Sequence, residues 1–320
     1  MLAAGLAALA AGAVRSQPAG RPARLGYLVL SPLSDSPSPQ RTAFFQRLRE
    51  LGHVEGRNLL VDYRSAEWQM ERLAPLAKEL ADRGVDVIFA NDTESATQVK
   101  RLGLRLPVVA HMHDPVALGI VDSLARPGGN ITGLSIIAND LAGKRLELLK
   151  EVLPKLRRVS VLWNPASAGA EVEWRATQVA ARQLGIDASP LEVRNADELL
   201  RTFGRMKAER PPALAVLSDV RVISYRKLIA DFAATQRLPT LFGFAEFAAA
   251  GGLLSYGVNL RDLYRRSAEY VDRILRGARP GELPVEQPST FEMVVNLKVA
   301  KALGVTIPQS LLLRADQVIE

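Results

Sequence analysis

Two histidines and a carboxylate lie close together in this chain, at His111, His113 and Asp114, and such groups bind metal ions or transfer protons. The His-x-His-x-Asp spacing of metal hydrolases would need aspartate at position 115, where this chain has proline. The third histidine is His53, and cysteine is absent, so no complete zinc site is predicted. On a strand His111 and His113 share one face, and we expect one or both to form hydrogen bonds in a cleft.

A second polar group, formed by Asn91, Asp92, Thr93 and Glu94, follows an apolar run and precedes a helical pattern toward Lys100. Thr93 is placed to cap that helix, and the N–H groups of a first helical turn attract anions such as a carboxylate. Plain helix capping without a ligand is the alternative for the same residues.

Enzyme motifs are missing from the sequence. It contains no Gly-x-Gly-x-x-Gly, no Walker phosphate loop and no Gly-x-Ser-x-Gly elbow, and three histidines leave little for acid–base catalysis. We therefore expect a protein that binds a ligand without transforming it and needs no cofactor or metal. The alternatives are a periplasmic ligand sensor or an enzyme on the same fold. A cytoplasmic location would favour an enzyme or a regulator.

The elements that must position these groups alternate between short β-rich runs and helical patterns, which predicts βαβ units with parallel sheets. A first series has strands at residues 25–30, 59–63, 85–90, 108–111 and 131–137. A second series has strands at 159–163, 189–193, 214–217 and 240–244 and helices at 170–184, 196–209 and 225–236. The predicted buried face of the last helix is Tyr225, Leu228, Ile229 and Phe232.

The length of 320 residues favours two lobes of about 100 to 150 residues each. We expect an α/β fold with one lobe from residues 24–137 plus about 258–284, and a second from 138–257 plus about 285–320. An amphipathic helix at 260–275 and a strand and helix at 291–296 and 297–303 complete the pattern.

The net charge of +7 comes from Lys and Arg that mostly lie beside Asp and Glu on helical faces. No basic patch with interleaved aromatic residues is visible, so we expect no nucleic-acid partner.

The N-terminal residues 1–23 are expected to be a signal peptide, with a disordered N-terminus as the alternative. Residues 2–14 are almost entirely Ala, Leu and Gly, and Ala-x-Ala sites occur at 8–10 and 11–13, although no positive segment precedes the run. The run is too short to span a bilayer, and no other is long enough, so stable membrane insertion is not expected. Without a lipobox cysteine, we expect a soluble periplasmic protein.

Several short phrases resemble the ABC-transporter substrate-binding proteins of the tryptophan-binding-like group, whose fold is the type I periplasmic binding protein. They occur in order over residues 24–320, at 26–28, 51–56, 114–116, 124–133, 141–145, 161–165, 251–257 and 283–288. The resemblance implies two Rossmann-like lobes, joined by three hinge crossings, that close over a small molecule and dock on ABC transporter permease subunits. Some members are associated with aromatic amino acids.

Ligands of open parallel sheets bind beyond the carboxyl ends of the strands, which selects the loops there. The candidates are Ser31, Leu33, Asn91, Asp92, Thr93, His111, Asp114 and Ser135 in the first lobe, and Asn164, Asp219, Phe242, Glu246, Ser255 and Tyr256 in the second lobe and its crossing. For Asp114 and Asn164 a turn is the alternative, and for Phe242 the core is. We expect an amino acid or an aromatic or other carboxylate ligand, with a nucleoside or neutral planar compound as the alternative.

Overall fold

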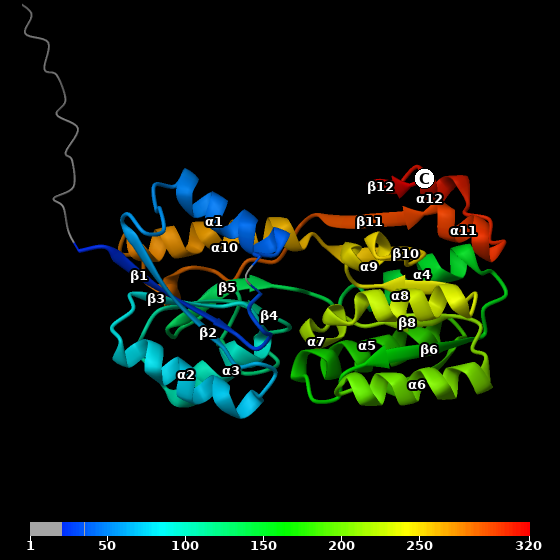
Figure 1. Cartoon of the computed structure of the whole chain (residues 1–320), viewed down its shortest axis with the longest axis horizontal. Helices are drawn as coiled ribbons and strands as arrows, with labels where there is room; N and C mark the ends of the chain where they lie inside the picture. The colour runs from blue at the N-terminus through cyan, green and yellow to red at the C-terminus, as the bar shows by residue number, and fades with distance from the viewer. Residues whose placement is uncertain (1–20, 35) are drawn as a thin grey trace, which may run out of the picture.

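Two β-sheets organise the chain into two α/β lobes that lie side by side (Figure 1). The computed structural model describes residues 21–34 and 36–320, so residues 1–20 of the expected signal peptide lie outside the described residues. The predicted α/β fold with parallel sheets in two lobes is confirmed.

The first sheet has five parallel strands in the order β2-β1-β3-β4-β5. They are β1 (Ala23–Val29), β2 (Leu59–Ser65), β3 (Val87–Ala90), β4 (Val108–Met112) and β5 (Ile131–Ser135). Helices α2 (Met70–Asp82) and α3 (Thr93–Leu102) cover one face of the sheet. On the other face, α1 (Pro39–Glu50) packs along α10 (Leu260–Leu275), which arrives from much later in the chain (Figure 1).

The second sheet has seven strands in the order β12-β11-β10-β9-β8-β6-β7, and only the β10–β11 pair is antiparallel. Its strands are β6 (Arg158–Trp163), β7 (Asp187–Glu192), β8 (Leu214–Val216), β9 (Thr240–Phe242), β10 (Leu254–Val258), β11 (Phe291–Asn296) and β12 (Gln317–Ile319). Its helices are α4 (Ala142–Val152), α5 (Ala168–Gln183), α6 (Ala196–Glu209), α7 (Val220–Ser224), α8 (Arg226–Thr235), α9 (Ala245–Ala249), α11 (Leu297–Leu303) and α12 (Gln309–Leu312).

The helix expected at 225–236 differs from the structure in one respect. Tyr225 separates α7 from α8, and Leu228, which was expected to be buried, is 49% exposed. The buried face holds Ile229, Ala230, Phe232 and Ala233. The two alanines let the helix lie close to the sheet, and a pattern based on large apolar residues overlooks them.

Three segments connect the lobes: residues 136–141 after β5, Asn259 between β10 and α10, and residues 287–290 before β11. Before the third connecting segment, the chain stays beside the first sheet as far as Glu286, slightly beyond the expected boundary at about residue 284. There the N–H of Glu286 donates to the Gly133 carbonyl at 2.9 Å. Asn259 then donates through Nδ2 to Glu292 at 3.0 Å, which joins the second crossing to the strand that follows the third.

A buried ion pair in the second lobe holds these crossings in place. Arg145 of α4 donates through Nε to the Tyr256 carbonyl at 2.7 Å and through a guanidinium nitrogen to the Ala138 carbonyl at 3.4 Å. The same guanidinium pairs with Glu173 of α5, whose carboxylate accepts the N–H of Ser218 at 2.8 Å. One arginine therefore joins the first crossing, the strand before the second crossing, and the loop that leads into α7.

Replacing Glu173→Gln should destabilise the protein strongly, because it leaves the Arg145 charge buried without a carboxylate. Breaking one partner of such a pair costs about 3–5 kcal/mol. The control is Glu171→Gln on the same helix, whose partner Arg175 is exposed and whose ion pair contributes about 0–1 kcal/mol. Urea unfolding measures both, and equal midpoints for the two variants would contradict the role given to Arg145.

Candidate functional site

A cavity of about 540 Å³ lies between the two lobes, where the carboxyl ends of both sets of parallel strands face each other. The first lobe contributes the loops after β1, β2, β3 and β4 together with the starts of α1 and α10. The second lobe contributes the starts of α5, α7 and α9 and the end of α7. The cavity volume lies within the range of small-molecule sites, about 300–1,000 Å³.

Half of the candidate residues line this cavity, and they come from both lobes. Those that line it are Ser31, Asn91, Asp92, Thr93, His111, Asp219 and Glu246.

The remaining first-lobe candidates lie elsewhere. Leu33 lines a groove on the outside of the first lobe. Asp114 has a positive φ of 25° and accepts the N–H of Ala117 at 3.1 Å, which is the turn alternative. The Ser135 hydroxyl accepts the N–H of Ile137 at the first crossing.

The remaining second-lobe candidates lie behind the cavity wall or away from it. Asn164 contacts Asp219 through Nδ2 at 3.4 Å and supports it from behind. Phe242 is fully buried and stacks on Phe247 at 4.4 Å between ring centroids, which is the core alternative. Ser255 is buried in β10, and Tyr256 packs against Phe291.

Two other residues that the sequence had pointed out also line the cavity: His113, expected in a cleft with His111, and Glu94, which follows Thr93. Lining residues that were not selected from the sequence include Trp68, Ile136, Ser167, Ile223, Arg226, Phe244, Arg261 and Tyr264. The position of Ser167, four residues after a strand and just before a helical pattern, was a usable capping signal. No local sequence pattern identified Arg261 or Tyr264 as cavity residues. Their helix, α10, joins the first lobe only after the chain has crossed the hinge twice.

The first-lobe wall is organised around the start of α3. Its N-cap is Asp92 and not Thr93: the carboxylate accepts the N–H of Ser95 at 2.7 Å and that of Leu30 at 3.0 Å. Thr93 instead positions His113. The Thr93 hydroxyl accepts the backbone N–H of His113 at 3.0 Å and lies 3.0 Å from Nδ1 of the His113 ring. Burial lowers the pKa of His113 to about 4, so the ring is neutral at pH 7.

The wall near α10 is neutral and aromatic. His111 Nε2 lies 2.7 Å from the Ser267 hydroxyl, and burial lowers its pKa to about 3. The ring packs against Tyr264 at 4.7 Å between centroids. Asn91 donates through Nδ2 to the Tyr264 hydroxyl at 3.0 Å, while its Oδ1 is buried without a hydrogen-bond partner among the described residues.

The buried charges of the cavity are negative. Burial raises the pKa of Asp92 and Asp219, and it raises that of Glu94 to about 8, with further contributions from the charges of Asp92 and Asp219. The arginines among the described lining residues, Arg226 and Arg261, are both exposed.

Several contacts across the cavity hold the lobes close together. Arg221 of α7 donates to the Trp68 carbonyl at 2.8 Å, and its guanidinium carbon lies 4.7 Å from the centre of the indole. Gly169, near the start of α5, lies against His113 so closely that a Cβ there would come within 2.5 Å of ring atom Cγ. The structure therefore has the lobes in contact over the cavity.

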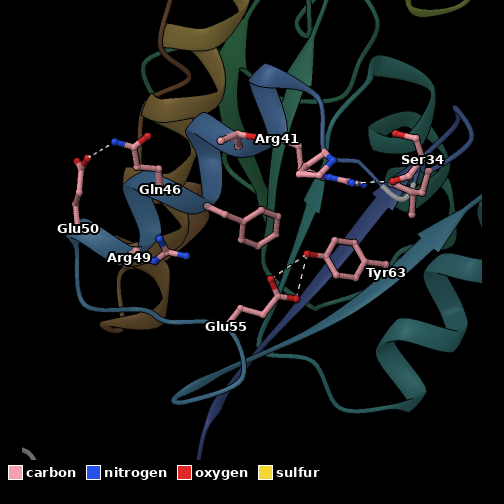
Figure 2. Close-up of a pocket in the computed structure, with 11 residues that line it drawn as sticks. Ser34, Arg41, Gln46, Arg49, Glu50, Glu55 and Tyr63 are labelled. Carbon is pink, nitrogen blue, oxygen red and sulfur yellow. Dashed lines mark hydrogen bonds between the residues drawn. The ribbon is translucent and has the colours of Figure 1, made fainter.

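The groove on the outside of the first lobe is larger, about 910 Å³, and is lined by α1 and β2 (Figure 2). Its polar groups already bond to one another. Arg41 donates to the Ser34 carbonyl at 2.8 Å, and Tyr63 donates to Glu55 at 3.1 Å. The interlobe cavity, with buried polar atoms left over, is thus the better candidate site.

Within residues 21–34 and 36–320, no group of three or more His, Cys, Asp or Glu side chains is arranged to hold a metal ion. The same part of the chain has no helix with the length and apolar character needed to cross a membrane.

Known proteins resemble this chain over most of its length. A tyrosine-binding protein of Clostridioides difficile is 24% identical over 277 residues, which cover 86% of this chain and 79% of the relative. A solved ABC domain from Streptococcus pneumonia in complex with L-Trp is 24% identical, with a TM-score of 0.84, covering 93% of this chain and 100% of that one.

A ligand-free, open structure of a substrate binding protein with adhesive properties from Clostridium difficile is 25% identical, with a TM-score of 0.66, covering 93% of this chain and 99% of that one. The family model described as ABC transporter substrate binding protein matches residues 31–319. On this match, which spans both lobes and the whole interlobe cavity, the chain belongs to the family of ABC transporter substrate-binding proteins.

Proposed function

We propose that this substrate-binding protein carries an amino acid or a related aromatic carboxylate to the permease subunits of an ABC importer, without chemical change. The observation that carries the proposal is the interlobe cavity, whose wall is assembled from both lobes and α10 and includes buried polar atoms of Asn91, Glu94 and His113 that have no partner among the described residues. A wall shared by two hinged lobes suits a ligand that is bound and released intact.

The chemistry of the cavity supports a zwitterion with an apolar or aromatic body. Trp68, Phe244 and Tyr264 supply aromatic surface on several sides. Because Asp92 and Glu94 already place two carboxylates at the start of α3, the ligand carboxylate is better accommodated beside Arg226 and Arg261 at the cavity mouth. The tyrosine-binding relative and the L-Trp complex support the same class.

Ligand binding is coupled to hinge closure in this proposal. The structure overlaps the L-Trp complex with a TM-score of 0.84 and the ligand-free open protein with 0.66, at equal coverage of this chain. The contacts of Arg221 with Trp68 and of Gly169 with His113 belong to the closed arrangement, since each joins the two lobes across the cavity.

The proposal includes export to the periplasm. It is supported by the Ala- and Leu-rich run at residues 2–14, by the Ala-x-Ala sites, and by a family whose members act outside the cytoplasm.

A thermal-shift screen of amino acids, aromatic acids, nucleosides and sugars should give its largest shifts with amino acids or aromatic acids. A ligand at one hundred times its dissociation constant adds about 2.7 kcal/mol to the free energy of unfolding. A response to nucleosides or sugars alone would contradict the proposed ligand class.

The Gly169→Ala substitution should weaken the best ligand of that screen by at least about tenfold, because the new methyl group meets His113 and keeps the lobes apart. X-ray scattering with ligand should show a larger radius of gyration than wild type. Gly204→Ala in α6 is the control, since a Cβ there meets nothing within 4 Å. If Gly169→Ala binds and compacts like Gly204→Ala, the closed contact between α5 and His113 is not needed for binding.

Export can be tested by sequencing the N-terminus of the protein recovered from its native periplasm. Processing between about residue 10 and residue 24 is expected for a signal peptide. An intact Met1 on protein recovered from the cytoplasm would refute export.

A further inference from the structure

Asp219 of the second lobe and Glu94 of the first are both buried at the cavity, and the two carboxylates differ in how well they are satisfied. Asp219, at the start of α7, is 3% exposed and accepts the N–H groups of Arg221 and Val222, both at 2.9 Å. Glu94, in the first turn of α3, is 8% exposed, and its Oε1 has no hydrogen-bond partner within the described chain. Asp219 therefore has both backbone donors of its helix start, whereas Oε1 of Glu94 has none among the described residues.

The groups around Glu94 offer no buried positive charge. Asp92, the N-cap of α3, lies two residues before Glu94. Across the cavity Glu94 faces Ser167 at the start of α5 and Asp219 at the start of α7. The other titratable or charged side chains of the described wall are His111, His113, Arg226, Glu246, Arg261 and Tyr264. Both histidines are neutral and both arginines are exposed, while Arg145 behind the wall is already paired with Glu173.

Three buried side-chain atoms of the described cavity lining lack a hydrogen-bond partner: His113 Nε2, which donates or accepts according to its tautomer, and two acceptors. Asn91 Oδ1 and Glu94 Oε1 are both buried without a donor in the part of the chain that the structure describes. An ammonium group brings three N–H donors and one positive charge, which is the chemistry that acceptors beside buried carboxylates call for. A carboxylate in the same place would add a further negative charge and satisfy neither acceptor.

We propose that Glu94 makes closure of the cleft depend on one positive charge between the lobes, supplied by the ammonium group of the ligand or, when the cleft is empty, by a proton on Glu94. This rests on the proposed function and narrows it: the substrate class is primary amines, with the carboxylate of an amino acid secondary. On binding, the ammonium replaces the proton, which leaves Glu94 for the solvent.

The titration of Glu94 supports this geometry. Burial, Asp92 and Asp219 raise its pKa to about 8 in the closed structure, against an ordinary value of 4.5. Between these values the closed, empty protein holds a proton that the open protein releases. The empty closed form is therefore favoured at low pH and is lost as pH rises through about 8.

The first test uses the full protein without any ligand. X-ray scattering at pH 5.5 and at pH 9 should give a larger radius of gyration at pH 9 for wild type, because an ionised Glu94 opposes closure. Glu94→Gln should stay compact at both pH values, and Glu171→Gln, an exposed change on α5, should behave as wild type. A wild-type radius that does not change with pH would overturn the proposal.

The second test compares ligands that differ in one group: L-tyrosine, tyramine and 3-(4-hydroxyphenyl)propionate, with L-tryptophan, tryptamine and indole-3-propionate as the parallel set. Each acid without an amine should bind wild type about ten- to a hundredfold more weakly than its amino acid, which is the effect of losing a charge-assisted hydrogen bond. Glu94→Gln should reduce this preference.

Calorimetry at pH 7 in phosphate and in Tris should show close to one proton released per amine bound by wild type, and none by Glu94→Gln. Equal binding of the acids and amines without proton release would overturn the role of Glu94 while leaving carboxylate binding in this cavity intact. If none of the six probes binds, the ligand class fails and the pH-dependent scattering alone decides the role of Glu94.

Discussion

The buried pair of Arg145 and Glu173 connects the hinge to the binding cavity. Isolated charges are very costly to bury, so Arg145 stays charged inside the second lobe only with a carboxylate and two backbone carbonyls around it. Those carbonyls belong to the first crossing and to the strand that leads into the second crossing. Glu173 in turn holds the N–H of Ser218, next to Asp219 of the cavity wall. The position of one cavity carboxylate thus depends on the same interaction that holds two hinge segments.

Close approach of backbone and side chains makes this arrangement possible. A Cβ at Gly257 would lie 1.8 Å from the Gly243 carbonyl oxygen, and one at Gly243 would lie 2.2 Å from the Ser218 hydroxyl. Both glycines border the Arg145 guanidinium. Gly169 performs a similar task between the lobes, where it leaves room for His113. Small residues at these points let the second lobe pack tightly inside and also meet the first lobe over the cavity.

Charge in the cavity follows from desolvation. Burial keeps His111 and His113 neutral, so they offer hydrogen bonds without a net charge. The same burial acts on the carboxylates, but Asp219 receives backbone N–H groups from its own helix start, and Glu94 does not receive comparable donors. Neutral histidines, anchored aspartates and a glutamate oxygen without a donor among the described residues thus share one cavity.

The sequence by itself determined the order of the elements, because hydrophobic period and turn residues are local properties. The helices Ala196–Glu209 and Leu260–Leu275 and the strand Phe291–Asn296 begin and end where the pattern predicts. It also located the strand-end loops that supply Asn91, Thr93, His111 and Asp219. The choice of these loops follows from the rule that ligands of parallel sheets bind beyond the carboxyl ends of their strands.

Only the tertiary structure decided which of these side chains share one cavity. Phe242 and Ser135 follow the same strand-end rule and yet pack inward, because the side-chain direction at a strand end depends on the neighbouring strands and helices. Arg261 and Tyr264 reach the site only because the chain returns to the first lobe at α10. The unsatisfied state of Glu94 likewise arises when a second lobe excludes water from it, since burial and contact between segments distant in sequence are properties of the folded, closed molecule.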